Sequence, residues 1–323
     1  MYTDITLEKG LYNICGKSFT EALSELDADE NYVGTELEGL DAFERQLKRF
    51  DIKVSGANSD RVEKFFTTTQ SAVLFPEFVR RCIKAGMDQA SVLDHISAAK
   101  TYTDGIDYRG LKITKNGADS AVDPGSALQI TSVENAAETV SVSKYGRQIQ
   151  AVYEVIRKQR LDLFAVVLKA TGAQIPSAID LAAVTALYTG ASSSSAAGAT
   201  PTYAELASFW ASMTGHNMTA MLVSPATMAA ILALEEMKDC SGDLGNGVVN
   251  TPYGVKLIKC SGMSDEYAIG VDSSSALETV FGSDVVVDSD KLISTQIDCI
   301  AFSVSVGFSK IYSDAVKVLS FTV

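Results

Sequence analysis

The sequence predicts an α+β fold, with helices in the first part of the chain and long strands at its end. Apolar residues recur at helical spacing between residues 18 and 50, and again from 161 to 188. From 284 onward apolar and polar residues alternate strongly, which is typical of half-buried strands. A chain of 323 residues, 46% of them hydrophobic, is long enough for two domains or one elaborated domain.

The composition excludes several classes of protein. With 21% charged and 8% aromatic residues, the chain has enough apolar side chain to fold, so it is not a disordered protein. Its net charge of −13 argues against nucleic-acid binding, which normally requires a basic surface. We expect any contact with DNA to be weak or repulsive.

The cysteines and the apolar runs indicate a soluble protein of a reducing compartment. The cysteines are odd in number and scattered, so they predict buried thiols rather than a disulfide framework or a CxxC metal pair. The N-terminus MYTDITLEKG lacks the pattern of a signal peptide. Lys169 and Pro225 interrupt the longest apolar runs, so we expect no membrane span and a cytoplasmic location.

The first seventy residues predict an acidic helical arm. Ser18 and Glu21 have the spacing of a capping box at the start of a short helix. A second apolar stripe from Leu37 to Phe50 predicts another helix. Up to Asp41 the chain has ten acidic and two basic residues, a net charge of −8, which is over half of the total.

Residues 105–143 predict a hairpin that cannot bury itself. Short alternating runs are separated by the turn sequences Asn116-Gly117 and Asp123-Pro124-Gly125. Few large apolar side chains are available to form a core around these runs. Because an isolated hairpin is marginally stable, we expect it to lie on another surface, such as a second subunit.

The rest of the chain predicts a long helix, a lobe and closing strands. Residues 161–188 predict one helix, kinked or divided near Gly172 and Pro176. A linker rich in small residues follows at 190–201, and alternating helices and strands predict an α/β lobe at 203–280. The C-terminal strands place a set of apolar residues on one face, namely Ile300, Phe302, Val304, Val306 and Phe308.

No catalytic motif is present. The sequence contains no GxSxG, HExxH or GxGxxG motif. His95 lies in a predicted surface helix and His216 in a turn, and we interpret both as structural or solvated. Gly16-Lys17-Ser18 lacks the spacing of a phosphate loop, and we interpret it as a turn before a helix cap. We therefore expect no enzyme activity and no cofactor.

One acidic segment leaves two interpretations open. From Asp27 to Glu38, oxygen-bearing residues stand at positions 1, 3, 5 and 12 of a calcium loop. Position 6, where the turn requires glycine, is Tyr32. The segment is either a calcium site or an acidic loop between two helices.

A cluster of basic residues stands out in this acidic chain, where an alternating pattern changes to a helical one. We call it the basic seam, and it consists of Lys144, Arg147, Arg157, Lys158 and Arg160. It contains no histidine or cysteine, so it has no evident chemistry. The seam is either a contact surface or a solvated face.

Several stretches resemble the major capsid protein of tailed bacteriophages, the Hong Kong 97 fold. They are LDAFERQLKRFDIKV and SDRVEKFFTTTQSAVLFPEFVRR in the arm and first strand, YGRQIQAVYEVIRKQRLDLF before the long helix, and LVSPATMAAILALEE and TPYGVKLIKCSGM in the lobe. The resemblance covers most of the chain. It implies an N-terminal arm (1–70), an extended loop (107–144), a spine helix (161–188), an axial domain (203–280) and a peripheral domain (71–106, 145–202 and 281–323).

The resemblance implies a structural protein of the virion that assembles itself in the cytoplasm of a bacterial host. Hexamers and pentamers would close an icosahedral capsid, first procapsid and then mature head, around double-stranded DNA that is enclosed without specific binding. About 70 residues precede the first matched strand, so we expect a separate scaffolding protein, together with a portal and no membrane. An encapsulin-type shell around a cargo enzyme is the main alternative, and a hydrolase or an adhesive or tail protein also stays open.

The resemblance also implies where subunits meet. The extended loop would lie across a neighbour, and the basic seam would face the acidic arm of an adjacent subunit. Lys112 and Lys115 lie in the loop that some members cross-link, but no acceptor is identified and we predict no cross-link. The expected contact residues are Arg109, Lys112, Lys115, Lys144, Arg147, Arg157, Lys158 and Arg160.

Overall fold

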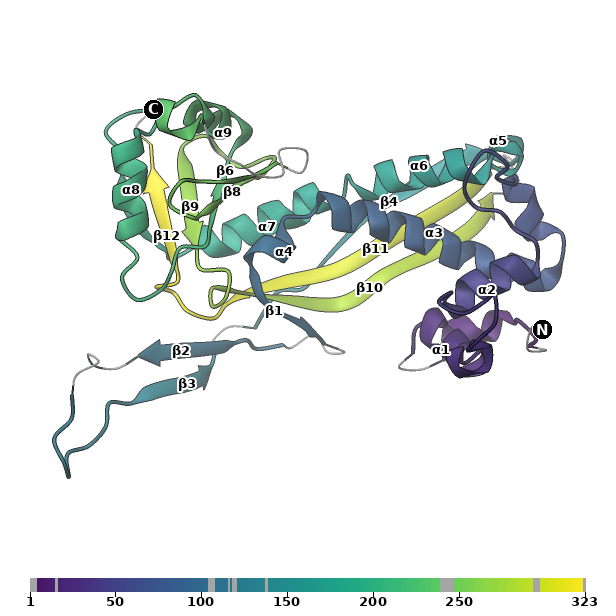
Figure 1. The fold of residues 1–323 in the computed structure, drawn as a ribbon, viewed down its shortest axis with the longest axis horizontal. Coiled ribbons are helices and arrows are strands. Elements are labelled where there is room, and N and C mark those ends of the chain that lie inside the picture. Colours follow the sequence, from purple (N-terminus) through teal and green to yellow (C-terminus); the bar gives the residue numbers. More distant parts are fainter. Residues whose placement is uncertain are drawn as a thin grey trace. The chain divides into compact units, whose positions relative to one another are not determined.

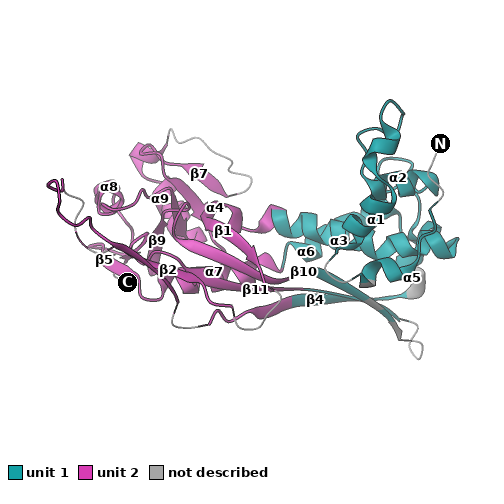
Figure 2. Cartoon of the chain, turned by 90° about the horizontal axis from the view of Figure 1, so that it is seen from below, with its two compact units in different colours: residues 1–88, 146–174, 285–303 teal, residues 89–145, 175–284, 304–323 magenta. Residues whose placement is uncertain are grey.

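The chain divides into two compact units, each built from three separate stretches (Figure 2). A computed structural model describes residues 5–14, 17–103, 108–115, 117, 121–136, 139–238, 247–292 and 297–321. The first unit comprises 1–88, 146–174 and 285–303, and the second comprises 89–145, 175–284 and 304–323. In the described ranges, no helix of either unit is long and apolar enough to cross a membrane.

Short helices form the N-terminal part of the first unit. Helices α1 (Phe19–Leu26) and α2 (Ala42–Arg49) each begin with a capping box, in which the first side chain and a glutamate three residues later each accept a backbone N–H. The predicted box of Ser18 and Glu21 is confirmed. Three 3-10 helices accompany them, at Lys9–Asn13, Asp29–Tyr32 and Val62–Phe66.

The stretch matched to the first strand is a helix, so that prediction is wrong. Helix α3 (Thr69–Ala90) has 22 residues and contains Pro76. Its β-branched and aromatic residues suit a strand, but buried pairs four residues apart, such as Leu74 with Phe78, place them on a helix face. The first strand of the described chain is β1 (Ser97–Tyr102), which follows the short helix α4 (Leu93–Ile96).

The predicted division of the long helix is confirmed. Helix α6 (Leu161–Gly172) belongs to the first unit and α7 (Pro176–Tyr188) to the second. Pro176 stands in the first turn of α7, where its missing N–H has no intrahelical partner to lose. The shorter helix α5 (Tyr153–Lys158) precedes α6.

Two glycines bring α3 and α6 into close contact in the first unit (Figure 1). A Cβ atom on Gly86 would lie 2.1 Å from the backbone oxygen of Lys169, and one on Gly172 would lie 2.4 Å from that of Ile83. Each glycine thus faces the backbone of the other helix. The close approach depends on the missing side chains at both positions.

A four-stranded sheet has the order β1-β10-β11-β4. Strand β1 pairs in parallel with β10, and the predicted C-terminal alternation is confirmed in β11, where Phe302, Val304 and Val306 are buried. Strands β4, β10 and β11 contribute residues to both units. Their bounds are β4 (Ser143–Val152), β10 (Leu277–Leu292) and β11 (Ile297–Lys310).

A six-stranded sheet with the order β5-β12-β9-β6-β8-β7 forms the lobe of the second unit. Helices and strands alternate along the chain here, as predicted, and a core that includes Phe209, Met221 and Leu257 is buried between them. The elements are α8 (Tyr203–Ala211), β6 (Ala220–Val223), α9 (Pro225–Leu232), β7 (Val248–Asn250), β8 (Lys256–Lys259) and β9 (Tyr267–Val271).

Two further strands join this sheet from segments that were predicted to lie elsewhere. Strand β12 (Val316–Ser320), grouped by the prediction with the peripheral residues 281–323, pairs with β9. Strand β5 (Ser192–Ser195), predicted as linker, pairs in parallel with β12. Both strands are held in the sheet by backbone hydrogen bonds. Such bonds need no apolar side chain, so even the four serines of β5 can form a strand.

The contact between α3 and α6 gives a stability prediction. Gly86→Ala and Gly172→Ala should each lower the free energy of unfolding by about 2–3 kcal/mol, because the added methyl group forces two backbones apart. Chemical denaturation followed by circular dichroism measures this. Gly10→Ala, where no atom lies within 4 Å of the added carbon, is the control. Equal stability of all the variants would contradict the contact.

Candidate interaction surfaces

The hairpin 108–136 has a sheet of its own and carries exposed apolar side chains. Strands β2 (Leu111–Lys115) and β3 (Thr131–Asn135) pair only with each other (Figure 1). Their register places Ile113 opposite Val133 on one face. Beside them, Leu128 is 76% exposed and Ile130 69%. Such a two-stranded sheet gains little from its own packing, so these side chains are available to another surface.

The basic residues predicted as contacts lie on three elements, β2, β4 and α5, and on the chain beside β2 and α6. Arg109 precedes β2, while Lys112 and Lys115 lie on it, and all three are exposed. Lys144 and Arg147 are exposed on β4, an edge strand of its sheet. The other three residues, Arg157, Lys158 and Arg160, lie close together in the sequence at the end of α5 and just before α6.

Arg160 is already engaged within its own unit. Its guanidinium donates to the backbone oxygens of Gly56 and Ala57 at 3.0 and 2.8 Å and reaches Asp162 at 3.1 Å. Backbone bonds beside it join the same segments, from Val62 N to Gln159 O and from Leu161 N to Asp60 O. Arg160 therefore has an internal role, and its predicted contact with another subunit stays a prediction.

Arg157 lines a small apolar cavity of the first unit. The cavity has a volume of about 80 Å³, and Asp290 and Asp298 are also among its lining residues. The guanidinium also lies 5.7 Å from the ring centre of Phe66. Arg157 is thus partly buried within its own unit, and Arg160, though exposed, is held by its own chain. Lys144, Arg147 and Lys158 are the other exposed members of the basic seam. The remaining lining residues are Phe75, Ile156, Cys299 and Ile300.

Helix α6 presents an apolar stripe to solvent. Leu163, Val166 and Val167 stand at i, i+3 and i+4 and are about half exposed or more. The opposite face of the helix is buried, so α6 is apolar on nearly all sides. This stripe is a second apolar surface that the described chain leaves uncovered.

The acidic segment 27–38 is held by an arginine of the same chain. Asp27 is fully buried and accepts hydrogen bonds from Arg45, Tyr32 and Gln46. Arg45 also pairs with Asp29 at 2.8 Å. The carboxylates that would begin a calcium loop are therefore already occupied by donors. Among the described residues, no group of three histidine, cysteine or acidic side chains could hold a metal.

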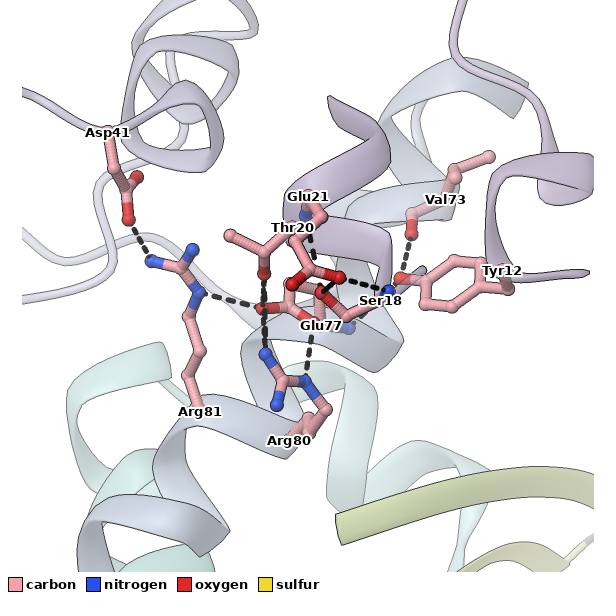
Figure 3. Close-up of polar contacts among 9 residues, drawn as sticks. All are labelled: Tyr12, Ser18, Thr20, Glu21, Asp41, Val73, Glu77, Arg80 and Arg81. Carbon is pink, nitrogen blue, oxygen red and sulfur yellow. Dashed lines mark hydrogen bonds and ion pairs between the residues drawn. The ribbon is translucent and has the colours of Figure 1, made fainter. Parts of the chain in front are cut away.

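A buried glutamate joins the N-terminal helices to α3 (Figure 3). Glu77, fully buried, accepts from Thr20 of α1, from Arg80 and from Arg81, each at 2.8 Å. Arg81 also pairs with Asp41, the cap of α2. Burial acts to raise the pKa of Glu77, but the two arginines and Thr20 outweigh it and hold that pKa below its ordinary value. The carboxylate is thus charged and fully paired.

Tyr12 adds a second link to α3. Its hydroxyl donates to the backbone oxygen of Val73 at 2.7 Å and accepts from the backbone N–H of Glu77 at 3.1 Å. Pro76 lacks the N–H that would donate to the backbone oxygen of Ala72, and Tyr12 bridges the next pair of backbone groups, Val73 O and Glu77 N. The segment predicted as an arm is therefore folded onto α3, and one of its acids, Asp41, pairs with Arg81 of that helix.

His216 lies among acidic and hydroxyl groups in the second unit. Its ring nitrogens are 3.4 Å from carboxylate oxygens of Asp272 and Asp314, and Ser275 Oγ is 3.1 Å from Nδ1. The backbone N–H groups of Ser275 and Ala276 both donate to Asp272 O, so neither is available to an oxyanion. The cluster joins three loops, and sequence spacing gave no sign of it. His95 lies half-buried on α4.

Asp180 is a buried carboxyl that forms no ion pair with any of the described residues. It lies on α7, is 4% exposed, and accepts from Ser91 Oγ at 3.3 Å and from Val92 N at 3.4 Å. Burial raises its pKa from 3.8 to about 7, against the smaller opposing effect of these two donors. Near neutral pH this side chain is therefore close to its titration point. Buried thiols are also present, at Cys82, Cys260 and Cys299.

Comparison with known proteins gives one family and several similar structures. Residues 136–292 match the family model of phage capsid proteins. The subunit of the virus-like particle from Pyrococcus furiosus is 14% identical with a TM-score of 0.53, and the match covers 76% of this chain and 98% of that one. The search of curated proteins found no match.

Two further solved structures have the same fold. The capsid of a native GTA particle is 12% identical with a TM-score of 0.54, over 73% of this chain and 91% of that one. The protein of Microbacterium phage Oxtober96 is 10% identical with a TM-score of 0.53, over 72% and 91%. The resemblance predicted from the sequence is confirmed by the family model and by these folds.

The buried carboxyl of α7 gives a prediction about pH. The unfolded chain loses the proton of Asp180 near pH 4, whereas the folded chain keeps it until about pH 7, so the free energy of unfolding falls across that interval. Asp180→Asn removes this loss. We expect the variant to be about 2–4 kcal/mol more stable than the parent at pH 8 and equal to it at pH 4.

Denaturant titrations at several pH values measure the effect of Asp180→Asn. The matched control is Asp288→Asn, since Asp288 is exposed on β10. An equal difference at pH 4 and pH 8 would show that the carboxyl does not titrate as its burial requires.

Proposed function

We propose that this chain, which has the fold of phage capsid proteins, is a structural subunit that assembles into the icosahedral capsid of a tailed, double-stranded-DNA bacteriophage. Copies of the chain would form hexamers and pentamers, first in a procapsid and then in the mature head. Repeated contacts of two different surfaces close into rings when the rotation between neighbours allows it. The subunit acts by its shape and needs no cofactor.

The observation that carries this proposal is the exposed hairpin. Val133 of β3, and Leu128 and Ile130 just before that strand, are each more than half exposed, and the sheet of β2 and β3 pairs with no other described strand. In a shell built from many copies of one chain, the neighbour of each hairpin is a second copy of that chain. We propose that the hairpin lies on that copy and buries these side chains there.

The negative charge of the chain is consistent with a capsid whose inner surface does not bind the enclosed DNA. A subunit with net charge −13 repels the phosphate backbone as a whole, so packaged DNA would move past it without specific binding. We also propose a scaffolding protein and a portal as partners, and assembly in the host cytoplasm. The family resemblance alone supports these partners.

A cargo-enclosing shell is the second candidate. The Pyrococcus furiosus virus-like particle, whose subunit is matched over 98% of its length, favours it. The two candidates share the fold and the shell and differ in the contents. A neighbouring terminase or portal gene would favour the phage capsid, and a neighbouring cargo enzyme would favour the encapsulin-type shell.

Electron microscopy of the purified protein tests the shell directly. The protein should be expressed alone and then with its neighbouring genes, because closure can require a scaffold. We expect closed particles with five-fold and six-fold lattice points. A stable monomer under every one of these conditions would contradict the proposed function.

The hairpin gives a prediction about assembly. Leu128→Ser combined with Ile130→Ser should raise the subunit concentration needed for shells by about 100-fold, since two apolar anchors are lost. The free energy of unfolding should stay within about 0.5 kcal/mol, because both side chains are exposed. Analytical ultracentrifugation measures the first quantity and denaturation the second. Val33→Ser with Val286→Ser, two exposed valines outside the hairpin, is the control.

Three exposed residues of the basic seam, Lys144, Arg147 and Lys158, give a second prediction. Replacing Lys144, Arg147 and Lys158 by glutamate should slow assembly about tenfold at low salt, with partial recovery at high salt. Arg157 and Arg160 are left intact because they have partners within the chain. Light scattering follows the rate of assembly.

The control for the seam variant carries the same change in net charge. It replaces the exposed residues Lys9, Lys53 and Lys256 by glutamate. Equal rates for the two triple variants would show that net charge alone causes the effect. They would contradict a contact between the basic seam and the acidic arm of an adjacent subunit.

A further inference from the structure

Both sides of the hairpin are fixed at its root, where they lie against β10 and β11 within the second unit. On the outgoing strand, Tyr108 donates its hydroxyl to the carboxylate of Glu278, which lies on β10. Thr101 of β1 donates to the same oxygen at 2.6 Å. Glu278 is buried, at 7% exposure, so two neutral hydroxyl groups hold a carboxylate that solvent hardly reaches. We call this group, with Gly110 and Ser309, the root clamp.

Gly110 brings the outgoing strand against β11. A Cβ atom at this position would lie 1.9 Å from Ser309 Oγ and 2.7 Å from Ser309 Cβ. Backbone bonds continue the attachment, from Ile113 N to Ile311 O at 3.3 Å and from Ala136 N to Gly110 O at 2.8 Å. No residue with a side chain fits in the position of Gly110 unless the strand moves away.

The returning strand is fixed in two glycine notches. Val140 is buried and lies against Gly307 of β11, where an added Cβ would be 2.7 Å from its methyl group. Val142 lies in the same way against Gly282 of β10, at 2.9 Å. Glycine inside a strand commonly marks the close approach of another backbone. Val140 N also donates to Tyr108 O at 2.7 Å, which joins the two strands at the root.

We infer that the root clamp is a positioning device, which fixes the direction in which the hairpin extends and so aims its apolar side chains at a second copy of the chain. This inference rests on the shell function proposed above and adds that the aim is set by residues that touch no partner. From Tyr108 to Asp123 is 15 residues, a length of chain that can span at most ~50 Å. A rotation of ~10° at the root would then move the tip by up to ~9 Å. A root free to rotate by that much would therefore move the apolar side chains away from their contact surface on the second copy.

The root clamp is buried, whereas the outer part of the hairpin is exposed. Glu278, Gly110 and Val140 are buried, whereas Leu128 and Ile130 are largely exposed. A contact surface that is held in place before binding loses less freedom on binding, and so binds more tightly for the same contacts. The buried residues at the root therefore act on the interface through the direction of the hairpin.

Two variants loosen the clamp without touching the exposed side chains. Tyr108→Phe removes the hydroxyl donor and keeps the ring, and Gly110→Ala forces a methyl group against Ser309. Matched controls are Tyr102→Phe, an exposed tyrosine at the end of β1, and Gly198→Ala, which has no atom within 4 Å of the added carbon. Ser309→Gly added to Gly110→Ala removes the clashing side chain and should restore the root.

Hydrogen exchange and assembly are measured on the same full-length proteins. In Tyr108→Phe and Gly110→Ala we expect the amides of Ala136 and Val140 to exchange about tenfold faster, and the subunit concentration needed for shells to rise about tenfold. The controls and the Gly110→Ala, Ser309→Gly double variant should behave as the parent. Melting temperatures should agree, which excludes global unfolding as the cause.

The outcomes separate the clamp from the function it serves. Faster exchange at the root with unchanged assembly would overturn the positioning role. Unchanged exchange in both variants would show that there is no clamp. A parent protein that forms no shell with or without its neighbouring genes would contradict the proposed function itself, while the exchange rates would still report whether the root is held.

Discussion

The structure depends on one constraint, which is that a two-stranded hairpin cannot bury its own apolar side chains. Leu128 and Ile130 stand exposed on it, and its strands pair with no other sheet among the described residues. The second unit supplies what such an element needs at its base, namely buried partners for Tyr108 and glycines on β10 and β11 that admit a second backbone. What it does not supply is a cover for the tip. An element fixed at one end and uncovered at the other is expected of a subunit that is completed by another subunit.

The first unit shows the opposite arrangement, in which charges and close contacts are used internally. Glu77 of α3 binds two arginines and a threonine, and two acids of the N-terminal segment, Asp27 and Asp41, are paired with Arg45 and Arg81. Reciprocal glycines on α3 and α6 allow the two backbones to touch. The basic seam is likewise divided, because Arg160 holds the segment 56–59 while Lys158 stays exposed. The sign of a charge in the sequence therefore does not say whether it faces its own chain or a neighbour.

Local features of the fold could be predicted from the sequence because they depend on neighbouring residues. The capping box of Ser18, the break before Pro176 and the alternation of β11 all follow from spacing along the chain. Helix α3 was missed because β-branched and aromatic residues with an internal proline are locally closer to a strand. The pairing of β12 in the lobe, and the bond between Tyr108 and Glu278, 170 positions apart, are long-range contacts that no local pattern encodes. The same limit applies to Arg160, whose partners lie about a hundred residues away.

The central claim is that the hairpin is completed only by a second copy of the chain. Hydrogen exchange of residues 111–115 and 131–135, measured on isolated subunits and on assembled particles of the same protein, tests it most directly. The account predicts fast exchange of the outer hairpin amides in the isolated subunit and at least about tenfold slower exchange in the particle, because burial on a neighbour suppresses opening of the hairpin. Equal exchange in the two states, whether fast or slow, would contradict it. The hairpin would then not be the element that assembly completes.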